Sequence, residues 1–474
     1  MKRKLKIIIS CIAVIALIVS MLAYLGQLTQ RKASIEKYTD FFEQEADFDV
    51  LFLGSSHMLN AVYPMELWAD YGIVSYNLAG HANTIPVDYW LLQNALQYTT
   101  PKVVVIDAMG IAIDFKINSK FEYMHMNFDA FPLTLTKIKT VLDLVDESQP
   151  GAGDKISRRM ELLWDFTTYH NRWTQLEETD FDINASPEKG AEIRVGVAKP
   201  DEVPEVSPDS KYEGNALGLQ YLDRIIRDCE ARGIEVLLTF LPFPATELRI
   251  MEANALYDIA EKYGVNYINF LAEGTVDFDT DCYDANSHLN PSGAHKVTNY
   301  LGRVLREEYS VPDRREDPVY AQWHEDYEEY HAFKFNKMAS QTSGNRYLMM
   351  LHDDDYSFVL ELDRWGKSHS KQYLALLSNL GIDPETVNED TRYVVANRQA
   401  GTLELVSLTQ LEAGPVETSL GILTLERGDE HYQLLLNGAV CITGDNRNEK
   451  NYDYRVAVYN SETVLLDFKE MKLN

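Results

Sequence analysis

A serine near the start of the chain is the first candidate for chemistry. Residues 48–53 form an apolar run that is typical of a buried β-strand, and the run leads directly into Gly54-Ser55-Ser56-His57. Open α/β sheets bind ligands at the carboxyl ends of their strands, so a Ser56 hydroxyl there could serve as a nucleophile. The alternative interpretation is structural, because serine commonly caps a helix that follows a strand.

A histidine just ahead of a helix-forming segment is the candidate base. His288 is preceded by the acids Asp281 and Asp284 and by the amide of Asn286. Serine, histidine and carboxylate are the groups of a nucleophilic acyl-transfer site, in which the carboxylate orients the imidazole. We expect Asp284 in that role. Asn286, which would orient the ring without charge, and the more distant Asp281 are the alternatives.

The two segments together resemble the SGNH/GDSL hydrolase family. That family carries its nucleophile in a Gly-Asp-Ser-type block, which Gly54-Ser55-Ser56 matches with Ser55 in the aspartate position. Its last block is an Asp-x-x-His pair that opens the final helix, whereas here Asp284 is four residues before His288. The resemblance covers about residues 46–310. It implies a triad of Ser56, His288 and Asp284.

The resemblance also implies a set of oxyanion donors. Residues 76–80 (Tyr-Asn-Leu-Ala-Gly) follow the second expected strand, and Gly80 matches the glycine whose amide the family uses beside the serine amide, here that of Ser56. The family's Gly-x-Asn-Asp block is missing after the third expected strand, so Asn83 is the expected substitute for its asparagine. Two further residues are possible orienting or substrate contacts, or merely structural, namely His57 and Asp107.

A narrower resemblance is to the membrane-anchored branch of the family, which includes the lipoteichoic-acid D-alanylation and alginate-type O-acetylation proteins. It implies an extracytoplasmic serine esterase or O-acyltransferase acting on acyl esters of an envelope polysaccharide or teichoic acid, beside a multipass membrane O-acyltransferase. The alternative is a catalytically degenerate scaffold that binds glycan or assists envelope assembly, because fold alone does not confer activity. No cluster has metal-ligand spacing, so we expect neither a metal nor an organic cofactor.

The pattern around these residues alternates strand and helix. This predicts an α/β domain over residues 33–310 with a doubly wound, mostly parallel sheet. The expected strands are residues 48–53, 73–77, 103–107, 234–240 and 265–270, and the expected helices are residues 87–99, 217–232, 246–263 and 292–309. A long insertion at residues 111–212, helical around 160–173 and extended from 184 to 210, is either a lid or binding segment or a surface decoration.

The C-terminal part has a different pattern. After a linker at residues 311–340, residues 341–474 read as a β-rich, sandwich-like accessory domain with one helix at 371–380. The expected strands are residues 347–352, 357–362, 393–397, 432–436 and 454–459. The last two weakly resemble the end of the interleukin-like EMT-inducer (PANDER-type) β domain, which implies a carbohydrate-associated module. A β-sandwich without a ligand is the alternative.

The N-terminus predicts a membrane anchor. Residues 1–32 hold six Lys or Arg and no acid, and residues 7–30 are 24 residues without a charge. This length favours an uncleaved signal anchor over a signal peptide, with residues 7–26 in the bilayer, a cytoplasmic N-terminus and an extracytoplasmic body. The unpatterned cysteines suit a Gram-positive bacterium. The net charge of −29 argues against nucleic acid as a partner.

Overall fold

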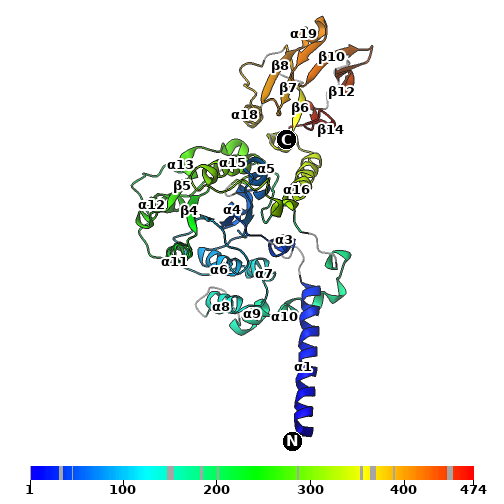
Figure 1. Ribbon diagram of the computed structural model, residues 1–474. Coiled ribbons are helices and arrows are strands. Elements are labelled where there is room, and N and C mark those ends of the chain that lie inside the picture. Colours follow the sequence, from blue (N-terminus) through cyan, green and yellow to red (C-terminus); the bar gives the residue numbers. More distant parts are fainter. Residues whose placement is uncertain are drawn as a thin grey trace. The chain divides into compact units, whose positions relative to one another are not determined.

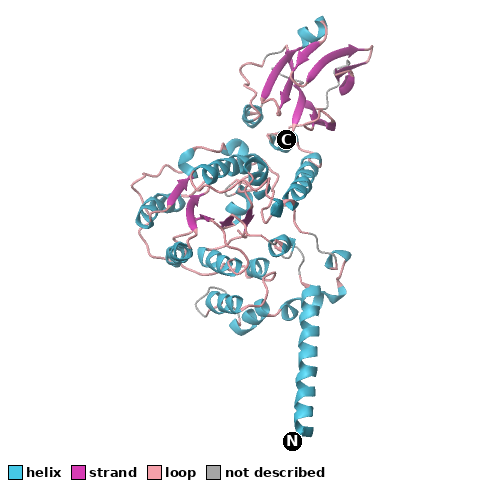
Figure 2. Cartoon of the chain, in the orientation of Figure 1, coloured by secondary structure: helices cyan, strands magenta, loops and turns pink. Residues whose placement is uncertain are grey.

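The computed structural model describes residues 2–30, 36–44, 46–146, 154–181, 185–199, 202–285, 288–352, 356–362, 370–387, 390–445 and 452–473 (Figures 1 and 2). The chain is mixed α/β and divides into two compact units. The first comprises residues 1–193, 202–275 and 296–330, and the second comprises residues 194–201, 276–295 and 331–474. Each unit is described by itself below.

The first unit contains a parallel five-stranded sheet in the order β2-β1-β3-β4-β5. Its strands are β1 (Val50–Leu53), β2 (Ser75–Asn77), β3 (Val103–Asp107), β4 (Glu235–Phe240) and β5 (Asn266–Asn269). The five expected strands are therefore confirmed within two residues at each end. Strands β1 and β3 are buried along their whole length, as expected for a parallel sheet with both faces covered.

Helices connect and cover these strands. Those of the sheet-bearing part are α3 (Thr39–Glu43), α4 (Ser56–Ala61), α5 (Pro64–Tyr71), α6 (Ile85–Ala95), α11 (Leu217–Arg232), α12 (Glu247–Tyr263), α13 (Phe270–Glu273), α15 (Pro291–Glu307) and η3 (Pro318–Tyr320). The four expected helices correspond to α6, α11, α12 and α15. Helix α15 starts in the second unit and continues into the first, and α16 (Gln322–Ala339) runs from the first into the second.

The strand order reverses between β1 and β3, since β2 lies on one side of β1 while β3, β4 and β5 follow on the other. Parallel sheets of this order bind ligands at the carboxyl ends of the strands beside that switch point. Strand β1 ends at Leu53 and β3 at Asp107, and the register pairs Leu53 with Ile106. The serine block and Asp107 therefore both follow strands that flank the switch point.

The insertion after β3 is helical in its first part and extended in its last. Its helices are α7 (Glu122–Phe128), α8 (Leu135–Leu144), α9 (Lys155–Leu163), α10 (Asp165–Tyr169), η1 (His170–Thr174) and η2 (Glu178–Asp180). Residues 191–199 have no regular secondary structure. Both features agree with the sequence-based expectation.

An N-terminal helix, α1 (Lys2–Thr29), precedes the first unit's sheet. Residues 4–29 are long and apolar enough to cross a membrane, and the most apolar stretch is unburied. The helix is compatible with the expected single-pass anchor, although a signal sequence also passes this test of length and composition.

The second unit contains two antiparallel sheets, with the orders β14-β13-β6-β7-β8 and β12-β11-β10-β9. Their strands are β6 (Ser357–Leu362), β7 (Thr391–Asn397), β8 (Thr402–Ser407), β9 (Val416–Thr418), β10 (Gly421–Arg427), β11 (His431–Leu436), β12 (Ala439–Asp445), β13 (Tyr454–Tyr459) and β14 (Leu465–Met471). The helices are α14 (Phe278–Asp281), α17 (Gly344–Met350), α18 (Lys371–Asn379) and α19 (Leu408–Ala413). One hydrophobic cluster draws residues from both sheets.

One expected strand of this unit is wrong. Residues 347–352 are not a strand, because α17 spans Gly344–Met350 and its apolar side chains are all buried. A short apolar run that is buried on every side has no periodicity that could separate helix from strand. By contrast, β6, β7, β11, β13 and α18 fall where the sequence predicted them.

Residues 276–295 group with the second unit, although the sequence assigned them to the α/β domain. Contacts within that unit explain the grouping. The Asn379 amide donates to the Ser292 hydroxyl at 2.7 Å, and the Asn290 amide donates to the Gly196 carbonyl at 2.9 Å. The ammonium of Lys371 is 2.7 Å from the Asp279 carboxylate. These partners lie far apart in sequence, so no local pattern could reveal the grouping.

Candidate functional site

The two serines of the predicted nucleophile block have different roles in the structure. The Ser55 hydroxyl caps α4 by accepting the His57 amide at 3.4 Å, and it lies 3.0 Å from His57 Nδ1. Ser56 is the first residue of α4 and is half-buried. The capping role, which was the structural alternative for this block, is therefore filled by Ser55. The His57 ring packs on Phe243 with 4.5 Å between ring centroids, which agrees with a structural role for His57.

Gly54 brings the serine turn close to the end of β3. Its φ of +152° is rarely adopted by residues with a side chain, and a Cβ there would lie 2.9 Å from Asp107 Cβ. The Asp88 carboxyl on α6 accepts a hydrogen bond from the Gly54 amide. Burial raises the pKa of Asp88 well above its ordinary value, and the nearby Asp107 adds to this rise. The turn before Ser56 is thus enclosed by two carboxyl groups from different elements.

Asp107 is the more exceptional of these two acids. It is 2% exposed, and burial raises its pKa to about 7 even though the Leu241 and Met109 amides donate to it. Among the residues that the structure describes, Asp107 Oδ2 has no hydrogen-bond partner. A buried, unpaired carboxyl oxygen is costly and points to a ligand or water at this position. The suggested substrate contact by Asp107 gains support from this geometry.

The two other expected oxyanion donors are already used within the fold. The Gly80 amide donates to the Gly54 carbonyl at 3.1 Å. The Asn83 amide nitrogen donates to Asp88 at 3.0 Å, and its oxygen accepts from Asn127 at 2.6 Å. The single N–H of Gly80 could hold an oxyanion only by giving up its bond to Gly54. The Asn83 amide has a second N–H besides the one that Asp88 accepts, so the oxyanion role that the resemblance implied stays a prediction for Asn83.

The predicted acid–base pair comes together in the second unit. His288 Nδ1 lies 2.6 Å from Asp284 Oδ2, and the His288 amide donates to Asp284 Oδ1 at 3.0 Å. A carboxylate at Nδ1 favours the tautomer that carries its proton there, which leaves Nε2 as the basic nitrogen. The surrounding loop is closed by a bridge between Cys282 and Leu289. The four-residue spacing is thus compatible with the contact.

The alternatives to Asp284 have different outcomes. Asp281 is fully buried and accepts hydrogen bonds from the Asp277 amide at 2.8 Å and from the Ser292 hydroxyl at 2.8 Å. These bonds fix the loop and give Asp281 a structural role. Asn286 lies outside the described residues.

The helix that follows His288 is bonded to the helix that begins with Ser56. Helix α15 starts at Pro291, and its Thr298 hydroxyl donates to the Ala61 carbonyl at 3.3 Å. The same hydroxyl accepts the Tyr63 amide at 3.1 Å. Ala61 is the last residue of α4. A fully buried threonine at this point therefore links α15 to the end of the serine-bearing helix.

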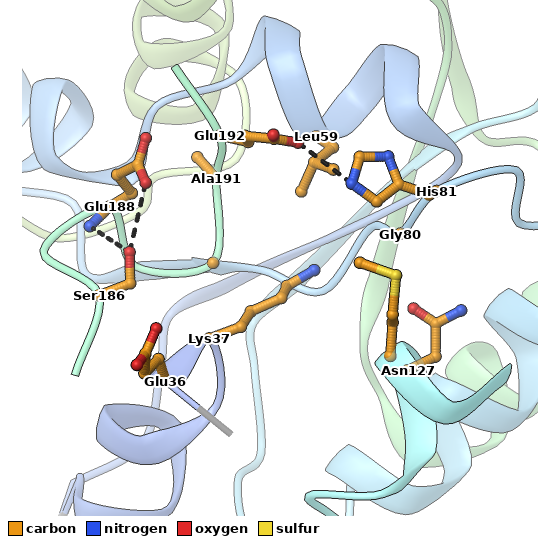
Figure 3. A pocket seen from close by; sticks show the side chains of 12 residues that line it. Glu36, Lys37, Leu59, Gly80, His81, Asn127, Ser186, Glu188, Ala191 and Glu192 are labelled. Carbon is orange, nitrogen blue, oxygen red and sulfur yellow. Dashed lines mark hydrogen bonds and ion pairs between the residues drawn. The ribbon is translucent and has the colours of Figure 1, made fainter. Parts of the chain in front are cut away.

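A pocket of about 280 Å³ opens beside α4 and the loop after β2 (Figure 3). Its titratable side chains are those of Glu36, Lys37, His81, Glu188 and Glu192. His81 Nε2 lies 3.2 Å from Glu192 Oε2. The Lys37 ammonium donates to the Ala79 carbonyl, and burial lowers its pKa to about 7 against the opposing effect of Glu192. The side chains of Leu59 and Met126 add apolar surface.

The sequence alone does not indicate that these residues line one pocket. The length of the insertion was a partial signal, because residues 186–192 from its extended tail form one wall. Lys37 gave no signal, since it follows the apolar helix as one of several charged residues. Only folding brings the N-terminal segment, the loop after β2 and the insertion to one place.

Comparison of the chain with protein-family models, with curated proteins and with solved structures found no match.

Proposed function

We propose that the protein is a membrane-anchored serine esterase or O-acyltransferase of the SGNH type that acts on acyl esters of a cell-envelope glycan. The observation that carries the proposal is the Asp284–His288 pair, whose 2.6 Å contact orients an imidazole as triads require. The 2-1-3-4-5 parallel order and the position of Ser56 after β1 support it.

In this proposal Ser56 Oγ attacks the ester carbonyl while His288 Nε2 takes the hydroxyl proton. Asp284 keeps its hydrogen bond to Nδ1 and stabilises the imidazolium. The tetrahedral intermediate collapses when the ester C–O bond breaks, and His288 returns the proton to the departing alcohol. Water or a glycan hydroxyl then releases the acyl group from Ser56 by the reverse sequence. The choice between hydrolysis and transfer depends on which acceptor reaches the acyl-enzyme.

The pocket beside α4 suggests where a sugar residue would lie. A pocket wall that combines carboxylates, an amide, an ammonium group and short apolar surfaces can form hydrogen bonds with the hydroxyl groups of a sugar. The carboxylates of Glu36, Glu188 and Glu192 outnumber the cations, which disfavours an anionic ligand. An uncharged sugar unit is therefore the better fit. Here Lys37 would bind the sugar with an ammonium that loses its proton near neutral pH.

The test uses the full chain in detergent with an acetyl ester substrate and a fluorophosphonate probe. We expect Ser56→Ala to abolish probe labelling and esterase activity, whereas the adjacent Ser55→Ala keeps labelling. Asp284→Asn should lower kcat by roughly 10²–10⁴-fold, because the imidazole loses its orienting charge. Labelling and activity that persist in Ser56→Ala would refute the proposal, and mass spectrometry of the adduct would then identify the residue that reacts.

A second candidate function is glycan binding without catalysis. The Gly80 amide, which already donates to the Gly54 carbonyl, favours this second candidate, because a triad that lacks one of its oxyanion donors is a poorer catalyst. This candidate predicts envelope polysaccharide binding that is equal in wild type and Ser56→Ala, with no probe labelling of either. A Glu192→Gln variant would separate the two candidates further. Both candidates predict that it weakens polysaccharide binding, but only the esterase or O-acyltransferase predicts a changed KM.

A further inference from the structure

The last turn of α1 is fixed to the insertion of the first unit. A Cβ on Gly26 would lie 2.9 Å from the Phe166 amide nitrogen, so the helix and α10 are in close contact. The Arg172 guanidinium donates to the Thr29 carbonyl at 2.7 Å and also to the Gln30 carbonyl. These are end carbonyls that the helix itself leaves unpaired. The insertion therefore packs directly against the C-terminal end of α1.

Burial along α1 changes sharply at this point. The described side chains from Lys4 to Met21 are all exposed, whereas Gly26, Thr29 and Gln30 are buried against the insertion. If α1 crosses a bilayer, its apolar part lies in lipid and its packed end lies at the bilayer surface. Figure 1 shows α10 beside this end of α1, and α9 and α8 farther along the same side of the first unit.

The insertion exposes several large apolar side chains. We call them the apolar rim, and they are Leu133, Leu135, Ile156, Met160, Trp173 and Phe181. Leu135 is 78% exposed, Ile156 72% and Trp173 70%. Most exposed large apolar side chains of the first unit outside α1 fall in this insertion. So many in one segment mark an interaction surface rather than the scattered exposure that soluble proteins tolerate.

The composition of the apolar rim matches a membrane interface. Ile156 and Met160 are four residues apart on α9 and share one face of that helix. The same short helix carries Lys155, Arg158 and Arg159, as helices that lie in the headgroup region commonly do. Trp173 directly follows Arg172, which holds the end of α1, and tryptophan is enriched at the level of the headgroups.

We infer that the apolar rim enters the headgroup region of the leaflet that α1 leaves, so that the first unit lies on the membrane surface instead of moving freely on a tether. The occupant of this surface is lipid. The inference rests on α1 crossing the bilayer and does not depend on the proposed esterase activity. It adds a second membrane contact, built from residues about 100–150 positions after the anchor in the sequence.

Spin labels read by electron paramagnetic resonance test the inference on the full chain. The chain is placed in vesicles of phosphatidylcholine with a minor fraction of phosphatidylglycerol, which contain no other protein. In a Cys11→Ser background, single labels are attached at Ile156→Cys and Trp173→Cys, because the other three native cysteines are buried. Leu248→Cys is the matched control, an exposed apolar residue on α12, a helix that belongs neither to the insertion nor to the apolar rim.

Labels at 156 and 173 should show an oxygen-to-nickel accessibility ratio about threefold or more above that of the label at 248, because lipid admits oxygen and excludes the nickel chelate. Equal ratios at all three positions would overturn the inference. Rim labels that are shielded only in native membrane fragments would also overturn it, since a membrane protein would then be the partner. A label on native Cys11 that reports water would remove the premise and the inference together.

Discussion

Glu361 in the second unit and Asp107 in the first are both buried carboxyl groups, yet their surroundings differ in the opposite sense. In the second unit Glu361 is fully buried, and it is 3.0 Å from Arg455 Nη1 and 3.1 Å from Arg392 Nε. The Tyr432 hydroxyl donates to the same carboxylate. In the first unit Asp107 is equally buried, but it accepts only backbone amides and keeps one oxygen without a partner among the described residues.

This difference separates a structural network from a candidate site. Arg392 and Arg455 both form ion pairs with the Glu361 carboxylate. These ion pairs link strands β6, β7 and β13 in one hydrogen-bonded network. Arg249 lowers the pKa of Asp107 only partly against the effect of burial, and no ion pair holds Asp107 among the residues that the structure describes, so the fold tolerates an unfavourable group there. Such groups collect at ligand sites, and this one lies beside the serine turn at the switch point of the sheet.

The largest expected effect is the loss of stability when the ion pairs of Glu361 are broken. Glu361→Gln should destabilise the second unit by about 3–5 kcal/mol, because it leaves Arg455, which is 3% exposed, as a buried charge with a weakened partner. Hydrogen exchange of peptides from β6 and β13, followed by mass spectrometry, would measure this loss locally. The exposed Glu417→Gln on β9 is the matched control and should change stability by less than about 0.5 kcal/mol. Unchanged exchange in Glu361→Gln would break the comparison.

The next effect is on the stability of the first unit, where substitution of Asp107 should be stabilising. Burial raises the pKa of Asp107 from 3.8 to about 7, so its ionisation disfavours folding as the pH rises between these values. Asp107→Asn removes that cost. We expect it to be more stable than wild type above pH 7 by on the order of 2 kcal/mol, and the difference should vanish toward pH 4.

Urea unfolding of the first unit at several pH values, read from hydrogen exchange of β3 peptides, would measure this difference. A gap between Asp107→Asn and wild type that is constant with pH would mean that Asp107 titrates normally in the folded state. In that case the contrast between the two units would be one of packing and not of charge.

The smallest effect is expected in the pocket. Burial lowers the pKa of Lys37 from 10.5 to about 7, so wild type bears the cost of a buried ammonium below pH 7 and is relieved of it as the pH rises toward 10.5. Lys37→Met should be more stable at acidic pH by about 1 kcal/mol, since the open pocket moderates the cost. The exposed Lys139→Met is the control, and because Lys37 is intact it should unfold with the same pH dependence as wild type. Thermal unfolding across this pH range is the measurement, and parallel slopes for wild type and Lys37→Met would contradict the prediction.

Local patterns were sufficient for much of the fold. The five strands of the parallel sheet and helices α6, α11, α12 and α15 follow from apolar runs and amphipathic periods bounded by turn residues. The same patterns missed β8, β9, β10, β12 and β14. Many of their side chains are exposed or only partly buried, so the contrast between apolar and polar positions that gives the period-two signal is weak. The error at residues 347–352 has the opposite cause, a run too uniformly apolar to show any period.

The sequence by itself determined that Ser56 follows a buried strand, that His288 precedes a helix, and that a long apolar helix begins the chain, because each depends on residues close together in the chain. Only the tertiary structure decided which serine caps α4, that the Gly80 amide is occupied, and that Lys37 lines a pocket with the insertion. It also paired Asp284 with His288 across an unusual spacing. These outcomes depend on hydrogen bonds and burial between segments that meet only after folding, and local composition does not encode such distances.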